Sequence, residues 1–240
     1  MKVELLQKDL VWADPEANLA AFDAEIAARP GADLYVLPEM FTTGFATRPE
    51  GIAEDMGLGL QWMKAKAASL DAAIAGSIAT FEDGRYYNRF YFVTPDNVWQ
   101  YDKHHLFTYG HEDDHFTAGT EKVVAQWRGV RFRLAVCYDL RFPVWLRNGE
   151  PAYDALIVVA SWPTPRAEAW KALIRARAIE NQCYVIAVNR TGEDPSCVYS
   201  GDSALLDAFG EKAEKIDMAS LEAFRKKFPV LNDADKFDIR

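Results

Sequence analysis

The sequence predicts an α/β protein whose strands and helices pack in layers, and two features of its apolar pattern lead to this prediction. Short apolar runs that indicate strands recur along the 240 residues, and segments with helical spacing lie among them. Several runs, such as residues 155–160, are apolar at every position, which is typical of strands covered on both faces. Two sheets packed face to face, with helices outside each, accommodate this many strands.

Four segments are expected to form helices. The start of the first is marked by Asp14 and Pro15, because a capping residue is followed by proline at the first helical position. Its apolar residues then recur at helical spacing. The four segments are residues 15–29, 60–70, 166–181 and a stretch from Ser220 that stops before Pro229.

Ten segments are strand candidates, and no repeat, low-complexity tract or Gly/Ser/Pro-rich linker divides them into separate units. We therefore expect one domain that spans residues 1–240. The strand candidates are residues 2–7, 33–38, 72–80, 85–94, 97–102, 122–127, 131–137, 154–160, 183–189 and 203–209.

Charge and composition exclude several classes of function. The chain has 27 Lys and Arg against 36 Asp and Glu, a net charge of −9, so it offers no positive field for nucleic acid. The sequence contains neither a signal-peptide pattern nor 18 consecutive apolar residues. Its three cysteines form no spaced framework, which suits free thiols in a reducing compartment. We expect a soluble, cytoplasmic protein that binds neither nucleic acid nor membrane.

Three of the predicted strands stop at a reactive side chain. The apolar runs that begin at residues 33, 98 and 132 are followed by Glu39, Lys103 and Cys137 respectively. Strand ends are where α/β sheets usually place ligand sites, so an acid, an amine and a thiol could meet in one pocket. Taken singly, each also has a structural interpretation: Glu39 as a turn residue, Lys103 as a solvated residue and Cys137 as a small buried hydrophobe.

The flanking residues favour the catalytic interpretation, because three segments resemble the catalytic motifs of the nitrilase superfamily and occur in that family's order. These segments are LPEMFTTGF (37–45), YDKHHLF (101–107) and VCYDLRFP (136–143). The likeness continues through VVASWPTPR (158–166), RARAIENQCYVIAVNR (175–190) and YSGDS (199–203), so it covers most of the chain.

The resemblance implies a four-layer α-β-β-α sandwich with a Glu-Lys-Cys triad formed by Glu39, Lys103 and Cys137. A second glutamate is commonly added in this family, and Glu112 matches its position. Glu112 could orient the Lys103 amine or cap a loop, and we expect it to orient the amine. No metal or other cofactor is expected, and the resemblance implies a homodimer.

The chemistry of amide hydrolysis gives each of these residues a role. An amide is a poor electrophile, so attack needs a thiolate, and Glu39 is expected to take the Cys137 proton. Glu39 then returns the proton to the departing nitrogen. The Lys103 ammonium and the backbone N–H of Tyr138 would stabilise the tetrahedral oxyanion. Water then releases the acid from a Cys137 thioester.

Five further residues are candidates for the substrate pocket or its border. Phe41 and Tyr138 flank catalytic residues and are expected to line the pocket. Trp162 and Arg166 follow a buried strand, so we expect a pocket wall and a carboxylate clamp, although a turn and contacts at a helix start would place them there equally well. Arg141 follows Cys137 closely and could bind an anionic substrate or make a structural salt bridge, and we expect the salt bridge.

Within the superfamily, the closest likeness is to the omega-amidase branch, whose substrates are short dicarboxylate monoamides such as 2-oxoglutaramate. It is carried by HLFTYGHEDDHFTAGT (105–120), CYDLRFPVW (137–145) and SWPTPR (161–166). Deaminated-glutathione amidases, nitrilases and carbamoyl-amine hydrolases use the same triad and stay open as alternatives.

Two alternatives belong to other classes. Residues 111–115 match the zinc-protease pattern H-E-x-x-H, which would make His111 and His115 ligands of a zinc hydrolase. That pattern works on a helix packed by apolar residues, whereas this segment carries two aspartates and lies between Gly110 and Gly119. A non-catalytic binding module ranks third, because it predicts a lost nucleophile and Cys137 is present.

Overall fold

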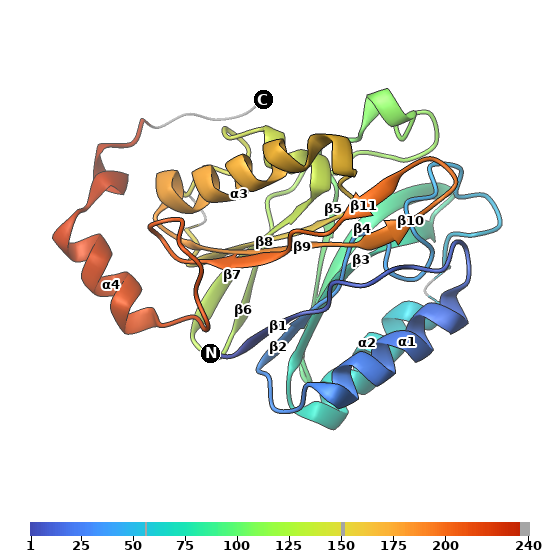
Figure 1. Ribbon diagram of the computed structural model, residues 1–240, viewed down its shortest axis with the longest axis horizontal. Helices are drawn as coiled ribbons and strands as arrows, with labels where there is room; N and C mark the ends of the chain where they lie inside the picture. Colours follow the sequence, from blue (N-terminus) through green and yellow to red (C-terminus); the bar gives the residue numbers. More distant parts are fainter. Residues whose placement is uncertain (56, 150–151, 236–240) are drawn as a thin grey trace.

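Two five-stranded β-sheets lie face to face in the computed structural model, which describes residues 1–55, 57–149 and 152–235 (Figure 1). The first sheet has the order β1-β2-β3-β4-β5, in which β1, β2 and β3 are parallel and β4 and β5 are antiparallel to their neighbours. Its strands are β1 (Val3–Leu5), β2 (Leu34–Val36), β3 (Ala73–Glu82), β4 (Arg85–Val93) and β5 (Val98–Asp102).

The second sheet has the order β12-β9-β8-β7-β6, with parallel strands in the middle and an antiparallel strand at each edge. Each of the ten predicted strands corresponds to one strand of the two sheets. The strands of the second sheet are β6 (Val124–Trp127), β7 (Val130–Val136), β8 (Ala155–Ala160), β9 (Tyr184–Asn189) and β12 (Ala204–Leu206).

A short hairpin was not predicted. It consists of β10 (Thr191–Glu193) and β11 (Val198–Ser200), which pair with each other and with neither large sheet. Its strands have three residues each, and Thr-Gly-Glu carries no apolar pattern from which a strand is predicted.

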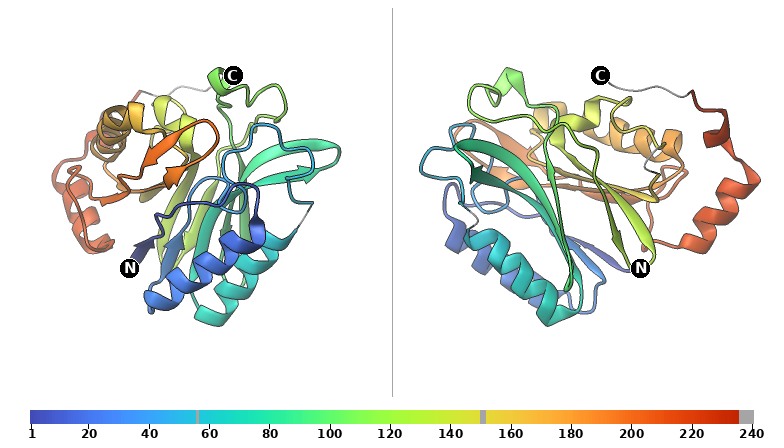
Figure 2. Two further views of the ribbon diagram at one scale, coloured as in Figure 1. Left: turned by 45° about the vertical axis from the view of Figure 1, so that its right-hand side comes forward. Right: turned by 180° about the vertical axis from the view of Figure 1, so that it is seen from behind.

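All four predicted helices are present; the first three lie on the outer faces of the two sheets, and the fourth lies at one end of the molecule (Figures 1 and 2). Helices α1 (Pro15–Ala28) and α2 (Leu58–Leu70) cover the first sheet, and α3 (Ala167–Asn181) covers the second. Helix α4 (Met218–Lys227) packs Leu221 into the core of the second sheet. It starts before the expected Ser220, because Asp217 is its cap and accepts the Ala219 N–H at 3.1 Å. The predicted α-β-β-α sandwich is confirmed.

The main core lies between the sheets. The rings of Phe92 in β4 and Phe132 in β7 stack across it with centroids 5.1 Å apart, and every residue of β8 is buried. A second core fills the space under α1 and α2, where Phe22, Tyr35 and Met63 are buried. Within the part of the chain that the structure describes, no helix is long and apolar enough to cross a bilayer.

Candidate active site

The three predicted catalytic residues follow strands whose carboxyl ends lie at one end of the sandwich. Glu39 comes after β2, Lys103 after β5 and Cys137 after β7. Strands β2 and β5 run in the same direction, because the two antiparallel pairings of β4 reverse the chain twice. Lys103 Nζ lies 2.9 Å from Glu39 Oε1, and Lys103 and Cys137 line one cavity. The structure therefore brings the predicted triad together.

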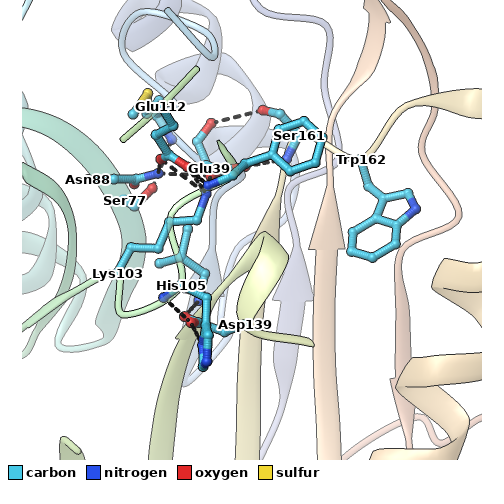
Figure 3. Close-up of polar contacts among 12 residues, drawn as sticks. Glu39, Ser77, Asn88, Lys103, His105, Glu112, Asp139, Ser161 and Trp162 are labelled. Carbon is cyan, nitrogen blue, oxygen red and sulfur yellow. Dashed lines mark hydrogen bonds and ion pairs between the residues drawn. The ribbon is translucent and has the colours of Figure 1, made fainter. Parts of the chain in front are cut away.

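Glu39 is held in a tight turn over β3. The next residue, Met40, has a φ of +45°, and its N–H donates to the Ser77 hydroxyl at 2.9 Å. From the second sheet, the backbone N–H of Ser161 donates to Glu39 Oε2 at 2.8 Å (Figure 3). The first contact fixes the turn on β3 and the second fixes the carboxylate, which is the preorganisation that a proton shuttle needs.

Lys103 and Glu112 form a fully buried ion pair. Lys103 Nζ lies 2.8 Å from Glu112 Oε2 and 3.1 Å from Glu112 Oε1, and the Phe107 N–H donates to Glu112 Oε2 at 2.6 Å. Burial alone would lower the pKa of Lys103, but the carboxylates of Glu112 and Glu39 overcome this effect and raise the pKa above its ordinary value. Lys103 is therefore an ammonium, and Glu112 lies where it can orient that ammonium.

The loop after Lys103 requires a glycine. The N–H of Gly119 donates to the Lys103 carbonyl at 3.0 Å, which brings the Gly119 backbone against β5. A Cβ at this position would lie 2.2 Å from the Asp102 carbonyl oxygen, far inside van der Waals contact. Any side chain at residue 119 would displace the backbone from which Lys103 projects.

Cys137 has a left-handed backbone conformation. It is the first residue of the 3₁₀-helix η2 (Cys137–Arg141), directly after β7, and has a φ of +43°. A non-glycine residue in this region is strained by roughly 1–2 kcal/mol, and such strain is concentrated at functional sites. The backbone N–H of Tyr138 belongs to the first turn of η2, where N–H groups lack partners within the helix.

Burial raises the pKa of the Cys137 thiol well above its ordinary value, and the Glu39 carboxylate adds to the rise while Lys103 opposes it. The Cys137 thiol is therefore protonated at neutral pH. Attack on an electrophile requires that its proton first be removed, and Glu39 is the carboxylate whose charge acts most strongly on this thiol.

A buried carboxylate ties the loop of Lys103 to the turn of Cys137. Asp139 Oδ1 accepts the backbone N–H of His105 at 2.9 Å and lies 2.9 Å from its Nδ1, while Asp139 Oδ2 accepts the Tyr101 hydroxyl at 2.7 Å and the Val136 N–H at 2.9 Å. Burial would raise the pKa of Asp139, but these hydrogen bonds, led by that from His105, lower it. Asp139 is thus an ionised anchor between the two loops (Figure 3).

A cavity of about 250 Å³ opens in front of the triad. Its walls come from the segment after Glu39, the loop after β5, η2, η3 (Thr164–Arg166) and the β10–β11 hairpin. Three of the predicted substrate-binding residues, Tyr138, Trp162 and Arg166, line this cavity.

The expectation that Phe41 lines the pocket is wrong. Phe41 is fully buried under α1 and α2, with its ring 5.8 Å from Phe22 and 6.0 Å from Trp62 between centroids. The turn that places Glu39 at the site directs Phe41 to the opposite side, into the core of the first sheet. Phe45, four residues further along, lines the cavity instead.

Two arginines in the cavity wall lie over aromatic rings. The Arg141 guanidinium is 4.7 Å from the Trp162 ring centroid, and that of Arg166 is 5.5 Å from the Phe107 centroid. Neither has an ion pair with a carboxylate among the described residues. The structural salt bridge expected for Arg141 is therefore absent from the described part of the chain, and its charge faces the cavity.

The zinc-protease interpretation is wrong, because residues 111–115 form no helix. His111 has a φ of +58° and an exposed side chain, and His115 Nδ1 lies 2.7 Å from Glu50 Oε1. Glu112, which would be the general base of such a site, is bound to Lys103. Among the described residues, no group of three or more His, Cys, Asp or Glu side chains is placed to hold a metal ion.

Two residues and one hairpin of the site were not predicted from the sequence. Asn88 in β4 donates to both Glu39 and Glu112, and its signal was a lone asparagine in the apolar stretch YYNRFYF. Ser161 acts through its backbone N–H, which has no signal in the sequence. The hairpin that closes one side of the cavity was missed with its strands.

Comparison with known proteins places the chain in a family. The carbon-nitrogen hydrolase family model matches residues 2–221. The omega-amidase YafV of Escherichia coli (strain K12) is 45% identical over 251 residues, which cover 99% of this chain and 98% of that protein. The 2-oxoglutaramate amidase of Bacillus subtilis (strain 168) is 34% identical over 98% of this chain and 97% of its own length.

Solved structures of similar proteins also indicate the carbon-nitrogen hydrolase family. XC1258 from Xanthomonas campestris, a CN-hydrolase superfamily protein with an arsenic adduct in its active site, superposes with a TM-score of 0.95 at 40% identity, covering 100% of this chain and 99% of that one. Saccharomyces cerevisiae Nit3 shares the fold, with a TM-score of 0.84 at 23% identity over 96% and 94% of the two chains. The chain described here belongs to the carbon-nitrogen hydrolase family of the nitrilase superfamily.

Proposed function

We propose that this protein is an omega-amidase, which hydrolyses the terminal amide of a small dicarboxylate monoamide such as 2-oxoglutaramate through a thioester on Cys137. The observation that carries the proposal is the combination, in one cavity, of Lys103 and Cys137 with two arginines that lack a carboxylate partner among the described residues. The identity to omega-amidases over nearly the whole chain supports it.

Acylation begins when Glu39 takes the proton of the Cys137 thiol and the thiolate attacks the amide carbon. Negative charge develops on the amide oxygen, where the Lys103 ammonium and the Tyr138 N–H donate to it. Glu39 then passes its proton to the amide nitrogen. The carbon–nitrogen bond breaks, ammonia leaves, and the acyl group stays on Cys137 as a thioester.

Deacylation uses the same residues in reverse. Water occupies the place of the departed ammonia, and Glu39 takes a proton from it as it attacks the thioester carbon. The same donors stabilise the second tetrahedral intermediate. The carbon–sulfur bond then breaks, the sulfur regains its proton, and the acid product leaves.

Arg141 and Arg166 supply the proposed specificity. A guanidinium binds a carboxylate through paired hydrogen bonds, and a ring beneath it restricts its orientation. The cavity of about 250 Å³ suits a short substrate rather than a peptide. An amide at Cys137 and a carboxylate at the arginines are the two ends of an omega-amide of a dicarboxylic acid.

The test measures ammonia release from 2-oxoglutaramate and from a neutral amide of similar chain length. Arg141→Ala and Arg166→Ala should each lower kcat/KM for 2-oxoglutaramate by roughly 10- to 100-fold, the effect of losing a charged hydrogen bond. Activity on the neutral amide should change little, because that substrate has no carboxylate to bind.

Arg175→Ala is the matched control, since Arg175 is an exposed arginine paired with Glu211 at 2.6 Å. It should leave both activities unchanged. Equal losses on the two substrates in the Arg141 and Arg166 variants would show that these arginines are structural. Preference of the wild type for a nitrile or a carbamoyl amine would favour another activity of the superfamily.

The homodimer, the single domain and the cytoplasmic location stay predictions from the sequence.

A further inference from the structure

One side chain outside the predicted catalytic set contacts both buried glutamates. Asn88 lies fully buried in β4, and its Nδ2 donates to Glu39 Oε1 at 2.8 Å and to Glu112 Oε1 at 3.0 Å (Figure 3). Lys103 Nζ contacts the same two oxygens at 2.9 and 3.1 Å. The two carboxylates are therefore bridged by a pair of donors, of which one is neutral and the other charged.

The backbone of Asn88 belongs to the same arrangement. Its carbonyl accepts the N–H of Lys103 at 3.0 Å, just beyond the end of β5. One residue of a central strand thus contacts Glu39, Glu112 and Lys103. A displacement of Asn88 would alter the position of all three.

The net charge of Glu39, Glu112 and Lys103 explains why a neutral hydrogen-bond donor stabilises this arrangement. The two buried carboxylates share a single buried ammonium, so one negative charge is left without a positive partner among these three groups. An amide adds a hydrogen bond to each carboxylate without adding charge, and such bonds favour the ionised form. Burial raises the pKa of Glu112, and the hydrogen bonds from Asn88 and Lys103 act against that rise.

The geometry of Asn88 also has a cost in stability. Its Oδ1 is buried and has no hydrogen-bond partner among the described residues. Buried polar atoms are nearly always paired, so an unpaired one calls for a reason. Here the orientation that leaves Oδ1 unpaired is the one that directs the amide N–H groups at Glu39 and Glu112.

We propose that Asn88 is a positioning residue that holds Glu39 and Glu112 at a fixed separation and keeps Glu39 in place to accept the Cys137 proton. Asn88 does not line the cavity, so it acts on turnover rather than on substrate binding. This inference rests on the proposed function.

Two variants test it. Asn88→Leu keeps the approximate volume and removes both donors, and Asn88→Asp keeps the shape and adds a third carboxylate. In both, kcat should fall by roughly 10- to 100-fold with little change in KM, as expected when a general base is misplaced. In Asn88→Leu, the acid limb of the kcat profile should move to higher pH by about one unit, because the carboxylates lose a hydrogen bond to their ionised form.

A second measurement does not depend on the substrate. Alkylation of Cys137 by iodoacetamide reports thiolate formation, and Asn88→Asp should slow it and raise its pH midpoint, because added negative charge disfavours the thiolate. If the wild type hydrolysed no amide, the proposed function would fail, whereas this comparison would still test the position of Asn88.

Asn148→Ala is the control for stability, since Asn148 is a buried asparagine whose Nδ2 donates to the carbonyls of Tyr153 and Asn181, each at 3.0 Å. It should lower Tm and leave both pH profiles unmoved. Unchanged kcat, acid limb and alkylation midpoint in the folded Asn88 variants would overturn the proposal. It would also be overturned if neither Asn88 variant folded while Asn148→Ala did, because Asn88 would then be structural.

Discussion

Replacement of Cys137 by alanine should abolish amide hydrolysis, with a loss in kcat of roughly 10,000-fold or more, because the covalent step has no substitute nucleophile. The fold should persist, since the exchange removes one sulfur atom next to a cavity and leaves the packing of η2 intact. Ammonia release measures the first expectation, and thermal unfolding measures the second.

Cys183→Ala is the matched control. Cys183 is a fully buried thiol in the core of the second sheet, so its loss tests the effect of deleting a sulfur away from the site. It should retain activity. Ammonia release by Cys137→Ala at a near wild-type rate would contradict the assignment of the nucleophile.

Replacement of Lys103 by methionine should affect both catalysis and stability. Loss of one oxyanion donor typically lowers the rate by on the order of 100- to 1000-fold. Glu39 and Glu112 would also be left buried without their common cation, which should cost about 3 kcal/mol in the free energy of unfolding. Chemical denaturation at several pH values measures this cost.

The pH dependence of that cost has a definite sign. Burial already raises the pKa of Glu112 in the folded protein, and removal of the ammonium would raise it further. A carboxyl whose pKa is raised by folding binds its proton more tightly in the folded state, so the variant should regain stability as the pH falls through that pKa.

The double variant Lys103→Met/Glu112→Gln is the control. It removes the cation together with one carboxylate, so it should recover part of the lost stability while its turnover stays as low as that of the single variant. If the single variant were folded and turned over at the wild-type rate, Lys103 would not be an oxyanion donor. If the double variant were less stable than the single one, the buried charge would not be the source of the loss.

The sequence predicted the strands well because most of them are buried on both faces and therefore read as apolar runs. Glu39, Lys103 and Cys137 could be proposed as a triad because each follows a predicted strand and the segments around them resemble the nitrilase motifs, although β5 before Lys103 is partly exposed. The β10–β11 hairpin could not be predicted, since each of its strands has only three residues and Thr191–Glu193 has no apolar pattern. Helix boundaries moved by one or two residues where a capping side chain, such as Asp217, determines the start.

The predictions for Phe41 and Arg141 were wrong for a different reason. Neighbours in a turn can face opposite sides of a sheet, and sequence proximity to Glu39 does not show that Phe41 points into the core. The pairing of an arginine likewise depends on tertiary contacts, as Arg141 shows by stacking on Trp162. A special role for Asn88 could have been predicted from the sequence, because asparagine is depleted in strands and this one lies in a largely apolar strand.

In the proposed mechanism, turnover passes through a thioester on Cys137. Rapid quench of the wild-type enzyme with 2-oxoglutaramate, followed by intact-mass analysis and peptide mapping, tests it most directly. We expect a transient acyl adduct on Cys137 that forms together with the first ammonia and disappears as the acid is released. An adduct on Cys183 or Cys197 would contradict the mechanism.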